Sequence, residues 1–321
     1  MPSIKIIAIF AALVAAVVPA KAQEWPQRPV VIVVPFAAGG NTDSIARLAA
    51  QRLSEEFGKQ FVVENRAGAA GAIAAETVAR ARPDGYTLLM AALPVMAIVP
   101  AMRKTPYDPV KDFEPISIVA TNPFVLVVSK DFPAKTVTEF VSYVHERPNA
   151  LAYSSAGVGS LNHLSMALFL KAAGLQMIHA PYKGNAPALA DVIAGHIPAM
   201  FSNLSDALPQ AAAGNIRLLA VSSPKRMPQV PDVPTVSESG YPQYKTLTWN
   251  GLMAPAGTPK EIIGKISGVI SRAGKDPKFV ERLTSYGADA LGNTPEEFAA
   301  MLAADVPLWA EAVKVAGVSE Q

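Results

Sequence analysis

The sequence predicts an α/β protein made of two lobes with a cleft between them. Short apolar runs alternate with segments of helical periodicity, which is typical of layered α/β domains. A strand, a glycine-containing loop and a helix follow one another twice, at residues 30–53 and again at residues 151–173. If each copy belongs to its own lobe, each lobe turns one helix N-terminus toward the space between them.

The first 22 residues have the pattern of a secretory signal peptide. Lys5 precedes an apolar run over residues 6–18, and Ala20-Lys21-Ala22 matches an A-x-A cleavage pattern. We expect cleavage after Ala22 and export to the periplasm, with an uncleaved membrane anchor as the alternative. No later stretch is long and apolar enough to span a bilayer. The chain has no cysteine, which excludes disulfides and thiolate chemistry.

The charge balance argues against two classes of partner. Removing residues 1–22 takes away two lysines and no acid, so 26 of the 28 basic residues remain against 26 acidic ones. A neutral chain without a basic cluster is not expected to bind nucleic acid or an anionic membrane surface.

The first lobe is expected to contain strands and helices in alternation. The apolar runs and periodic segments predict strands at residues 30–34, 61–64, 87–90 and 116–120, and helices at residues 42–57 and 70–81. Near the C-terminus they predict a strand at 249–254 and two helices, each opened by a threonine cap followed by proline and glutamate, at Thr258 and Thr294.

The second lobe is expected to occupy the middle of the chain. Its predicted strands are residues 124–129, 151–153, 176–180, 197–201 and 217–222, and its helices are 161–173, 186–194 and one that opens with a capping box at Thr136 and Glu139. Thr121-Asn122-Pro123 is interpreted as the break between strands 116–120 and 124–129, and the proline-rich residues 228–244 as a surface crossing. We therefore expect a discontinuous first lobe, residues 23–122 plus 246–321, and a second lobe, residues 123–245.

The glycine loops are candidate anion sites, but not for nucleotides. Neither loop has the lysine of a phosphate loop, and Gly157-Val158-Gly159-Ser160-Leu161-Asn162 lacks the third glycine of a dinucleotide fingerprint. Free N–H groups at a helix start can hold a carboxylate instead, helped by neighbouring hydroxyls and amides. The two sets of candidates, neither of which contains Arg or Lys, are Gly39, Gly40, Asn41 and Thr42, and Ser154, Ser155, Gly157 and Ser160.

Several of these residues also have a purely structural interpretation. Asn41 or Thr42 is expected to cap the first helix, with the other one free to contact a ligand. Asp43 in the first turn is interpreted as structural, and Ser160 is equally suited to a cap or a contact. His163 is either a neutral hydrogen-bond donor to the ligand or a buried structural histidine.

The sequence indicates no catalytic site, no metal site and no cofactor. Ser160 follows Gly159 directly and so lies outside a G-x-S-x-G elbow. The four histidines show no spacing typical of paired metal ligands, and no isolated pair of carboxylates stands out.

Motifs along the whole mature chain resemble the receptor family of tripartite tricarboxylate transporters, the Bug-type periplasmic binding proteins. They include WPQRPVVIVVPFAAGGNTD, VVENRAGAAG, PDGYTLL, LAYSSAGVGSLNHL, APYKGNAPALAD and GLMAPAGTP. The resemblance implies a type 2, Venus-flytrap fold, a carboxylate ligand, and membrane subunits of a secondary transporter as partners. We also expect a monomer. The resemblance also implies ligand contacts from Phe36, Gly39, Gly40, Asn41, Thr42, Ser154, Ser155, Gly157, Ser160 and, less directly, Asn203.

The chain departs from this family's usual pattern at Ala91-Ala92-Leu93-Pro94, where relatives often have Ser, Thr and Gly. An apolar wall there, joined by Phe36, Phe201 and Trp249, would suit a flat or aliphatic acid; the alternative is that these residues are ordinary core. Lys183 is either a cation at the rim of the cleft or a solvated side chain.

Two other functions remain open from the sequence. One is a periplasmic hydrolase or lyase acting on an organic acid, because catalytic residues can assemble from distant positions. The other is a receptor that presents its ligand to a sensor kinase.

Overall fold

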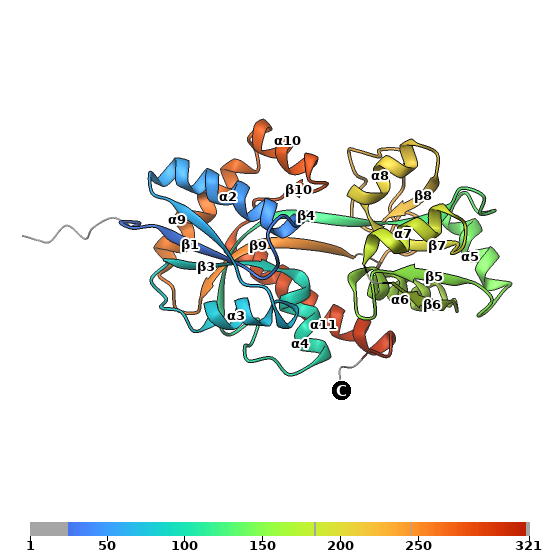
Figure 1. Cartoon of the computed structure of the whole chain (residues 1–321), viewed down its shortest axis with the longest axis horizontal. Coiled ribbons are helices and arrows are strands. Elements are labelled where there is room, and N and C mark those ends of the chain that lie inside the picture. The colour runs from blue at the N-terminus through green and yellow to red at the C-terminus, as the bar shows by residue number, and fades with distance from the viewer. Residues whose placement is uncertain (1–24, 183, 245, 319–321) are drawn as a thin grey trace, which may run out of the picture.

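The computed structural model describes residues 25–182, 184–244 and 246–318, and it shows two α/β lobes joined side by side. The predicted signal peptide at residues 1–22 lies outside the described residues. In Figure 1 the first lobe lies on the left and the second on the right, with two long strands, β4 (Phe113–Ser129) and β9 (Leu247–Pro255), running between them. The predicted α/β, two-lobed fold class is confirmed.

The first lobe has a mixed sheet in the order β2–β1–β3–β9–β4. Strands β1 (Val30–Val34), β2 (Phe61–Asn65) and β3 (Thr87–Ala92) are parallel, while β9 runs antiparallel to both β3 and β4, and the short β10 (Asp289–Ala290) pairs with β4. Its helices are α2 (Asn41–Phe57), α3 (Ala72–Ala79), α4 (Val99–Met102), α9 (Lys260–Ala273), α10 (Pro277–Ser285) and α11 (Pro295–Val315), with one-turn helices at Ala69–Gly71 and Pro94–Ile98.

Helices cover both faces of this sheet, so its central strand β1 is apolar throughout. Ile32 packs in a core that includes side chains of α2, α9 and α10, whereas its neighbour Val33 packs in a second core with side chains of α3 and α11. Successive strand side chains point to opposite faces, and both faces here are dry. The VVIVV run that ends at the glycine loop is therefore a central strand whose carboxyl end is held firmly.

The second lobe has its own sheet in the order β4–β7–β5–β6, with β8 (Ile216–Val221) pairing with β4. Its other strands are β5 (Ala152–Ser155), β6 (Ile178–Pro181) and β7 (Ala199–Asn203), and its helices are α5 (Val137–His145), α6 (Leu161–Ala173), α7 (Asn185–Ile193) and α8 (Leu204–Ala212). The described part of the proline-rich segment has no helix or strand beyond a single bridge between Val221 and Thr235.

The two strands expected on either side of Thr121-Asn122-Pro123 are one continuous strand, and that prediction was wrong. β4 has 17 residues; its first part pairs with β9 and its second part with β7 and β8. Asn122 pairs with Thr248 and Pro123 with Leu247, so the strand continues through the expected break as it passes from one lobe to the other. The division of the lobes at residues 122 and 246 stays a prediction.

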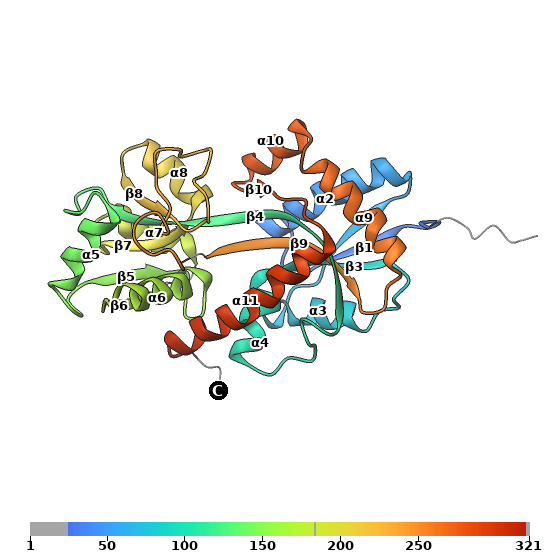
Figure 2. The same ribbon diagram turned by 180° about the vertical axis from the view of Figure 1, so that it is seen from behind.

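Helix α11 also crosses between the lobes. Figure 2 shows it in front of the first sheet, running toward α6 of the second lobe. Near its end, Glu311 forms an ion pair with Lys171 of α6 at 2.5 Å. Among the described residues, no helix combines the length and apolar character needed to cross a bilayer.

Three of the expected helix caps can be checked. Thr294 forms the full capping box with Glu297, and Thr136 accepts the backbone N–H of Glu139. Thr258 was expected to cap α9, and that prediction was wrong. Its hydroxyl donates to the carbonyl of Pro255 at 2.7 Å, and Pro259 occupies the cap position. Helix α10, a third helix between α9 and α11, was not predicted.

Candidate functional site

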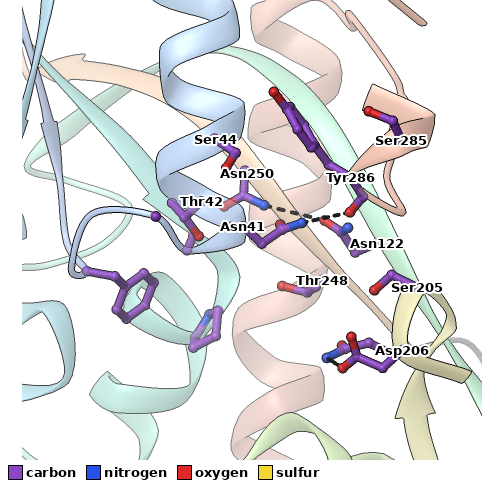
Figure 3. Close-up of a pocket in the computed structure, with 15 residues that line it drawn as sticks. Asn41, Thr42, Ser44, Asn122, Ser205, Asp206, Thr248, Asn250, Ser285 and Tyr286 are labelled. Atoms are coloured by element: carbon purple, nitrogen blue, oxygen red, sulfur yellow. Dashed lines mark hydrogen bonds between the residues drawn. The ribbon is translucent and has the colours of Figure 1, made fainter. Parts of the chain in front are cut away.

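A cleft of about 540 Å³ lies between the lobes (Figure 3). This volume is in the range of sites for small molecules, roughly 300–1,000 Å³. Its walls come from the loop after β1 and the start of α2, the end of β3, the crossing strands β4 and β9, the end of α10, and the start of α8. The lining residues are Phe36, Gly39, Asn41, Thr42, Ser44, Ala92, Pro94, Asn122, Asn203, Ser205, Asp206, Thr248, Asn250, Ser285 and Tyr286.

The glycine loop of the first lobe is held in shape by Asp43. This side chain is 2% exposed, and it accepts the backbone N–H of Gly39 at 2.9 Å and the Nε–H of Arg47 at 2.9 Å. Its other oxygen accepts from Asn65 Nδ2, which also donates to the carbonyl of Phe36. Burial acts to raise the pKa of Asp43, but these hydrogen bonds and the Arg47 charge together lower it below its ordinary value of 3.8. Asp43 is therefore ionised and fixes the loop. Because it does not line the cleft, it places no charge against a bound ligand.

The start of α2 opens into the cleft without a side-chain cap. Gly40 is the N-cap residue and makes no side-chain hydrogen bond, so the expectation that Asn41 or Thr42 caps this helix was wrong. Both residues lie in the first turn of the helix, and Gly39 makes the turn before it with φ of +85°. Asn41 Nδ2 donates to the carbonyl of Tyr286, while the hydroxyl of Thr42 makes no hydrogen bond among the described residues. The first-turn N–H groups and the Thr42 hydroxyl are thus available to an anion.

Amides from the crossing strands form the floor of the cleft. Asn122 Nδ2 donates to the carbonyl of Gly287 at 3.1 Å, and its Oδ1 accepts from Asn250 Nδ2 at 3.5 Å. Asn250 is 2% exposed, and Thr248 lies two residues before it on β9. These polar side chains sit where both connecting strands pass between the lobes, so a molecule bound here touches the connection itself.

The second lobe faces the cleft with the start of α8, across from α2 (Figure 3). Asn203 is the N-cap residue of α8, and its Nδ2 donates to Asp206 at 3.4 Å. Asn185 donates to the same carboxylate at 2.6 Å and accepts from Asn162, whose amide also donates to the carbonyl of Phe201. This chain of amides connects the start of α6 to the cleft through α7 and α8.

The second glycine loop does not line this cleft. Ser154 donates to the carbonyl of Ala188, and the hydroxyl of Ser155 bridges the N–H and the carbonyl of Gly157. Ser160 caps α6 by accepting the N–H of His163, which agrees with its structural interpretation. Ser154 and Ser155 belong to β5 and not to the loop. Contact of Ser154, Ser155, Gly157, Ser160 and His163 with a ligand stays a prediction.

The apolar wall is smaller than the sequence indicated. Phe36, Ala92 and Pro94 line the cleft, but Phe201 and Trp249 are fully buried core residues, as the alternative interpretation held. Trp249 donates its Nε1–H to Asp305 at 2.7 Å, and Asp305 does not line the cleft. Lys183 lies outside the described residues.

Sequence reasoning missed about half of the lining. Asn122, Thr248 and Asn250 are polar residues inside strands, where an alternation of polar and apolar residues could have pointed to them. Ser205 and Asp206 follow the predicted Asn203, and a helix start after a strand was the available signal. Ser285 and Tyr286 could not be found without α10.

The described lining residues are mostly polar, and none of them is basic. Among the lining residues Asp206 is the one carboxylic acid, and none is Lys, Arg or His. Within the described part of the chain, no group of three or more acidic, histidine or cysteine side chains is placed to hold a metal ion. The arrangement is suited to holding a small anion through helix N–H groups, hydroxyls and amides.

Comparisons with known proteins agree with this arrangement. The family model of the tripartite tricarboxylate transporter family receptor matches residues 45–318. The chain is 38% identical to Rpa4515 of R. palustris, solved with adipate, over 92% of this chain and 99% of that one, with a TM-score of 0.75. It is 39% identical to the periplasmic binding protein BugD over 92% and 100% of the two chains, with a TM-score of 0.71.

A further solved structure is MatC (Rpa3494) from Rhodopseudomonas palustris with bound malate. It is 34% identical over 90% of this chain and 100% of that one, with a TM-score of 0.71. The family model spans most of the sequence, and these likenesses cover both lobes. The chain therefore belongs to the receptor family of the tripartite tricarboxylate transporters.

Proposed function

We propose that the protein is a periplasmic receptor that binds a short aliphatic dicarboxylate in the interlobe cleft and delivers it to the membrane subunits of a tripartite secondary transporter. The observation that carries this proposal is the start of α2, which turns an uncapped helix N-terminus and the Thr42 hydroxyl into a cleft whose described lining residues include no basic side chain. Adipate in Rpa4515 and malate in MatC are acids of the size that the cleft admits.

Neutral donors suit a receptor that must release its ligand. A carboxylate at the start of α2 gains from the helix dipole and from hydrogen bonds, typically without the strong bidentate pairing of an arginine site. When one carboxylate of the ligand binds at α2, the rest of the ligand lies over Asn122 and Asn250. A second carboxylate or a hydroxyl of the ligand can form hydrogen bonds with these amide groups. Binding without a covalent step is the expected outcome, in keeping with a receptor family.

Closure of the lobes follows from differential affinity. A ligand that touches α2 from one side and the Asn203 region of α8 from the other interacts with both only when the lobes approach. It therefore favours the closed form by the free energy of the interactions that the open form lacks. The crossing strands β4 and β9 are the elements that would bend, because β4 pairs in both sheets and β9 runs beside it toward the second lobe (Figure 1).

The test is a thermal-shift screen of the mature protein with mono-, di- and tricarboxylates, followed by calorimetric titration of the best acid. Binding raises Tm by an amount that grows with affinity and ligand concentration. NMR of the recovered acid should show it unchanged, whereas a new product would support the hydrolase or lyase alternative. No stabilisation by any acid at millimolar concentration would contradict the proposal.

A further inference from the structure

A second cavity, of about 480 Å³, lies behind α6 and shares no lining residue with the cleft. One wall comes from β5, α6 and β6 of the second lobe, including Tyr153, His163 and His179. The opposite wall is the last turn of α11 and the residues after it, including Val318. The cavity is therefore built at the contact between α11 and the second lobe, where Lys171 pairs with Glu311.

Two adjacent residues at the start of α6 have different surroundings. Asn162 turns toward the cleft side, where its amide donates to Asn185 and to the carbonyl of Phe201. His163, one residue later and about 100° further around the helix, lines the cavity instead. The histidine that the sequence suggested as either a ligand contact or a buried structural residue thus lines, in this structure, a cavity other than the cleft.

His163 presents a fixed donor to the cavity. Only 4% of it is exposed, and its Nδ1 accepts the backbone N–H of Gly159 at 3.1 Å. In a neutral imidazole the proton then resides on Nε2, which makes no hydrogen bond among the described residues. Burial, with a smaller effect from His179, lowers the pKa of His163 to about 4, so the ring stays neutral and a single donor at neutral pH.

Stacked rings hold His163 and a second donor, the Tyr153 hydroxyl, in place. The rings of His163 and His179 lie 3.7 Å apart and within 4° of parallel, and Tyr153 stacks on His179 at 5.0 Å. His179 is anchored by the 2.7 Å contact of its Nε2 with Ser155. Tyr153 is 3% exposed, and its hydroxyl has no partner among the described residues. Hydrogen bonds to a charged acceptor are stronger than those to a neutral one, so an anion that accepts from both groups would gain affinity from each.

The other residues that line the cavity indicate the charge and polarity of its ligand. Among the described residues no acidic side chain lines the cavity, and Lys171 at its edge is the one cation among the lining residues. Leu170, Leu175 and Val318 supply apolar surface beside the two donors. We propose that this cavity is a second binding site, for a small monocarboxylic acid with a short apolar body. Its carboxylate accepts from His163 Nε2–H and the Tyr153 hydroxyl, and its apolar part packs against α6 and Val318.

The test uses benzoate, with benzyl alcohol and benzylamine as neutral and cationic analogues, in calorimetric titrations of the mature protein. Benzoate should bind at least fivefold more tightly than either analogue. Equal binding of benzyl alcohol, stronger binding of benzylamine, or no binding of benzoate at 10 mM would overturn the proposal.

Two variants and two controls locate the bound benzoate. Tyr153→Phe removes one donor with little change in shape, and Val318→Trp fills the cavity from the last described residue of the chain. Each should weaken benzoate binding fivefold or more. Tyr143→Phe, the same change on α5 outside the cavity, and Thr42→Val in the cleft should leave it unchanged. Loss of benzoate binding in Thr42→Val but not in Tyr153→Phe would place the acid in the cleft and end the second-site proposal, while the proposed receptor function would stand.

Discussion

The carboxylate of Asp43 accepts the backbone N–H of Gly39 at 2.9 Å, so one buried side chain of α2 holds the loop that precedes its own helix. The same carboxylate accepts from Arg47 and Asn65. The uncapped helix start therefore keeps its position in the cleft without using the Asn41 or Thr42 side chain as a cap. The residue that shapes the site is thus not itself among the residues that line it.

Replacing Asp43 by alanine should destabilise the protein and weaken ligand binding together. Three donors lose their partner, and we expect the free energy of unfolding to fall by about 2–3 kcal/mol. Urea denaturation measures this loss. Asp131→Ala is the matched control, since Asp131 is exposed, and it should change the free energy of unfolding by less than about 0.5 kcal/mol. Equal effects of the two substitutions would contradict the role given to Asp43.

The contribution of Asp43 should depend on pH in a defined direction. Its pKa in the folded protein is lowered from 3.8, so the folded state favours the ionised form. The stabilisation is therefore fully present above pH 3.8 and is lost as the pH falls through the lower, folded-state value. The difference in stability between wild type and Asp43→Asn, followed by urea titrations from pH 7 to pH 3, should shrink toward the acid end. A difference that grows on acidification would have the wrong sign.

Thr42 and Ser160 should separate binding from stability. Thr42→Val removes a hydroxyl that caps nothing, so we expect affinity for the acid to fall about fivefold to tenfold, roughly 1–1.4 kcal/mol, with unchanged Tm of the free protein. Ser160→Ala removes a helix cap and should cost about 1 kcal/mol of stability, with little change in affinity if the second loop stays outside the site. Calorimetry and thermal melts on both variants check this pair. The reverse pattern would mean that the second loop, not the first, holds the ligand.

Asp206 should limit the affinity for dianions. It is exposed at the cleft and would repel a carboxylate placed near the start of α8. Asp206→Asn should tighten binding of an unsubstituted dicarboxylate about threefold to tenfold at low salt, because like charges a few ångströms apart near a surface cost about 1 kcal/mol or more. The gain should shrink at 0.5 M salt. Unchanged affinity at both ionic strengths would show that the ligand does not approach α8.

How much could be predicted from the sequence depends on how local each feature is. The bounds of β1 and of α6 follow from an apolar run and from a serine cap with a glycine after the last turn, and the structure has them where they were expected. The continuity of β4 could not be found locally, because Thr121-Asn122-Pro123 has the composition of a turn and stays extended only through pairing with β9.

The residues of the candidate site also differ in how far they could be predicted from local sequence. The first loop was found because glycine, hydroxyl and amide residues at a helix start have a local meaning, although Gly40 and not a side chain occupies the cap position. The surroundings of His163 on α6 could not be predicted. Neighbouring residues on a helix face different partners, and only the packing of the two lobes decides which side of the helix faces the cleft. Asn250 was missed because a polar residue in an apolar strand gains its role from Asn122, 128 residues earlier.

A crystal structure of the mature protein with the most stabilising dicarboxylate tests the central claim most directly. We expect the lobes closed and one carboxylate at the start of α2, within hydrogen-bond distance of the Thr42 hydroxyl and the first-turn N–H groups. The acid bound away from α2, or in the cleft with the carboxylate directed away from this helix start, would contradict the account.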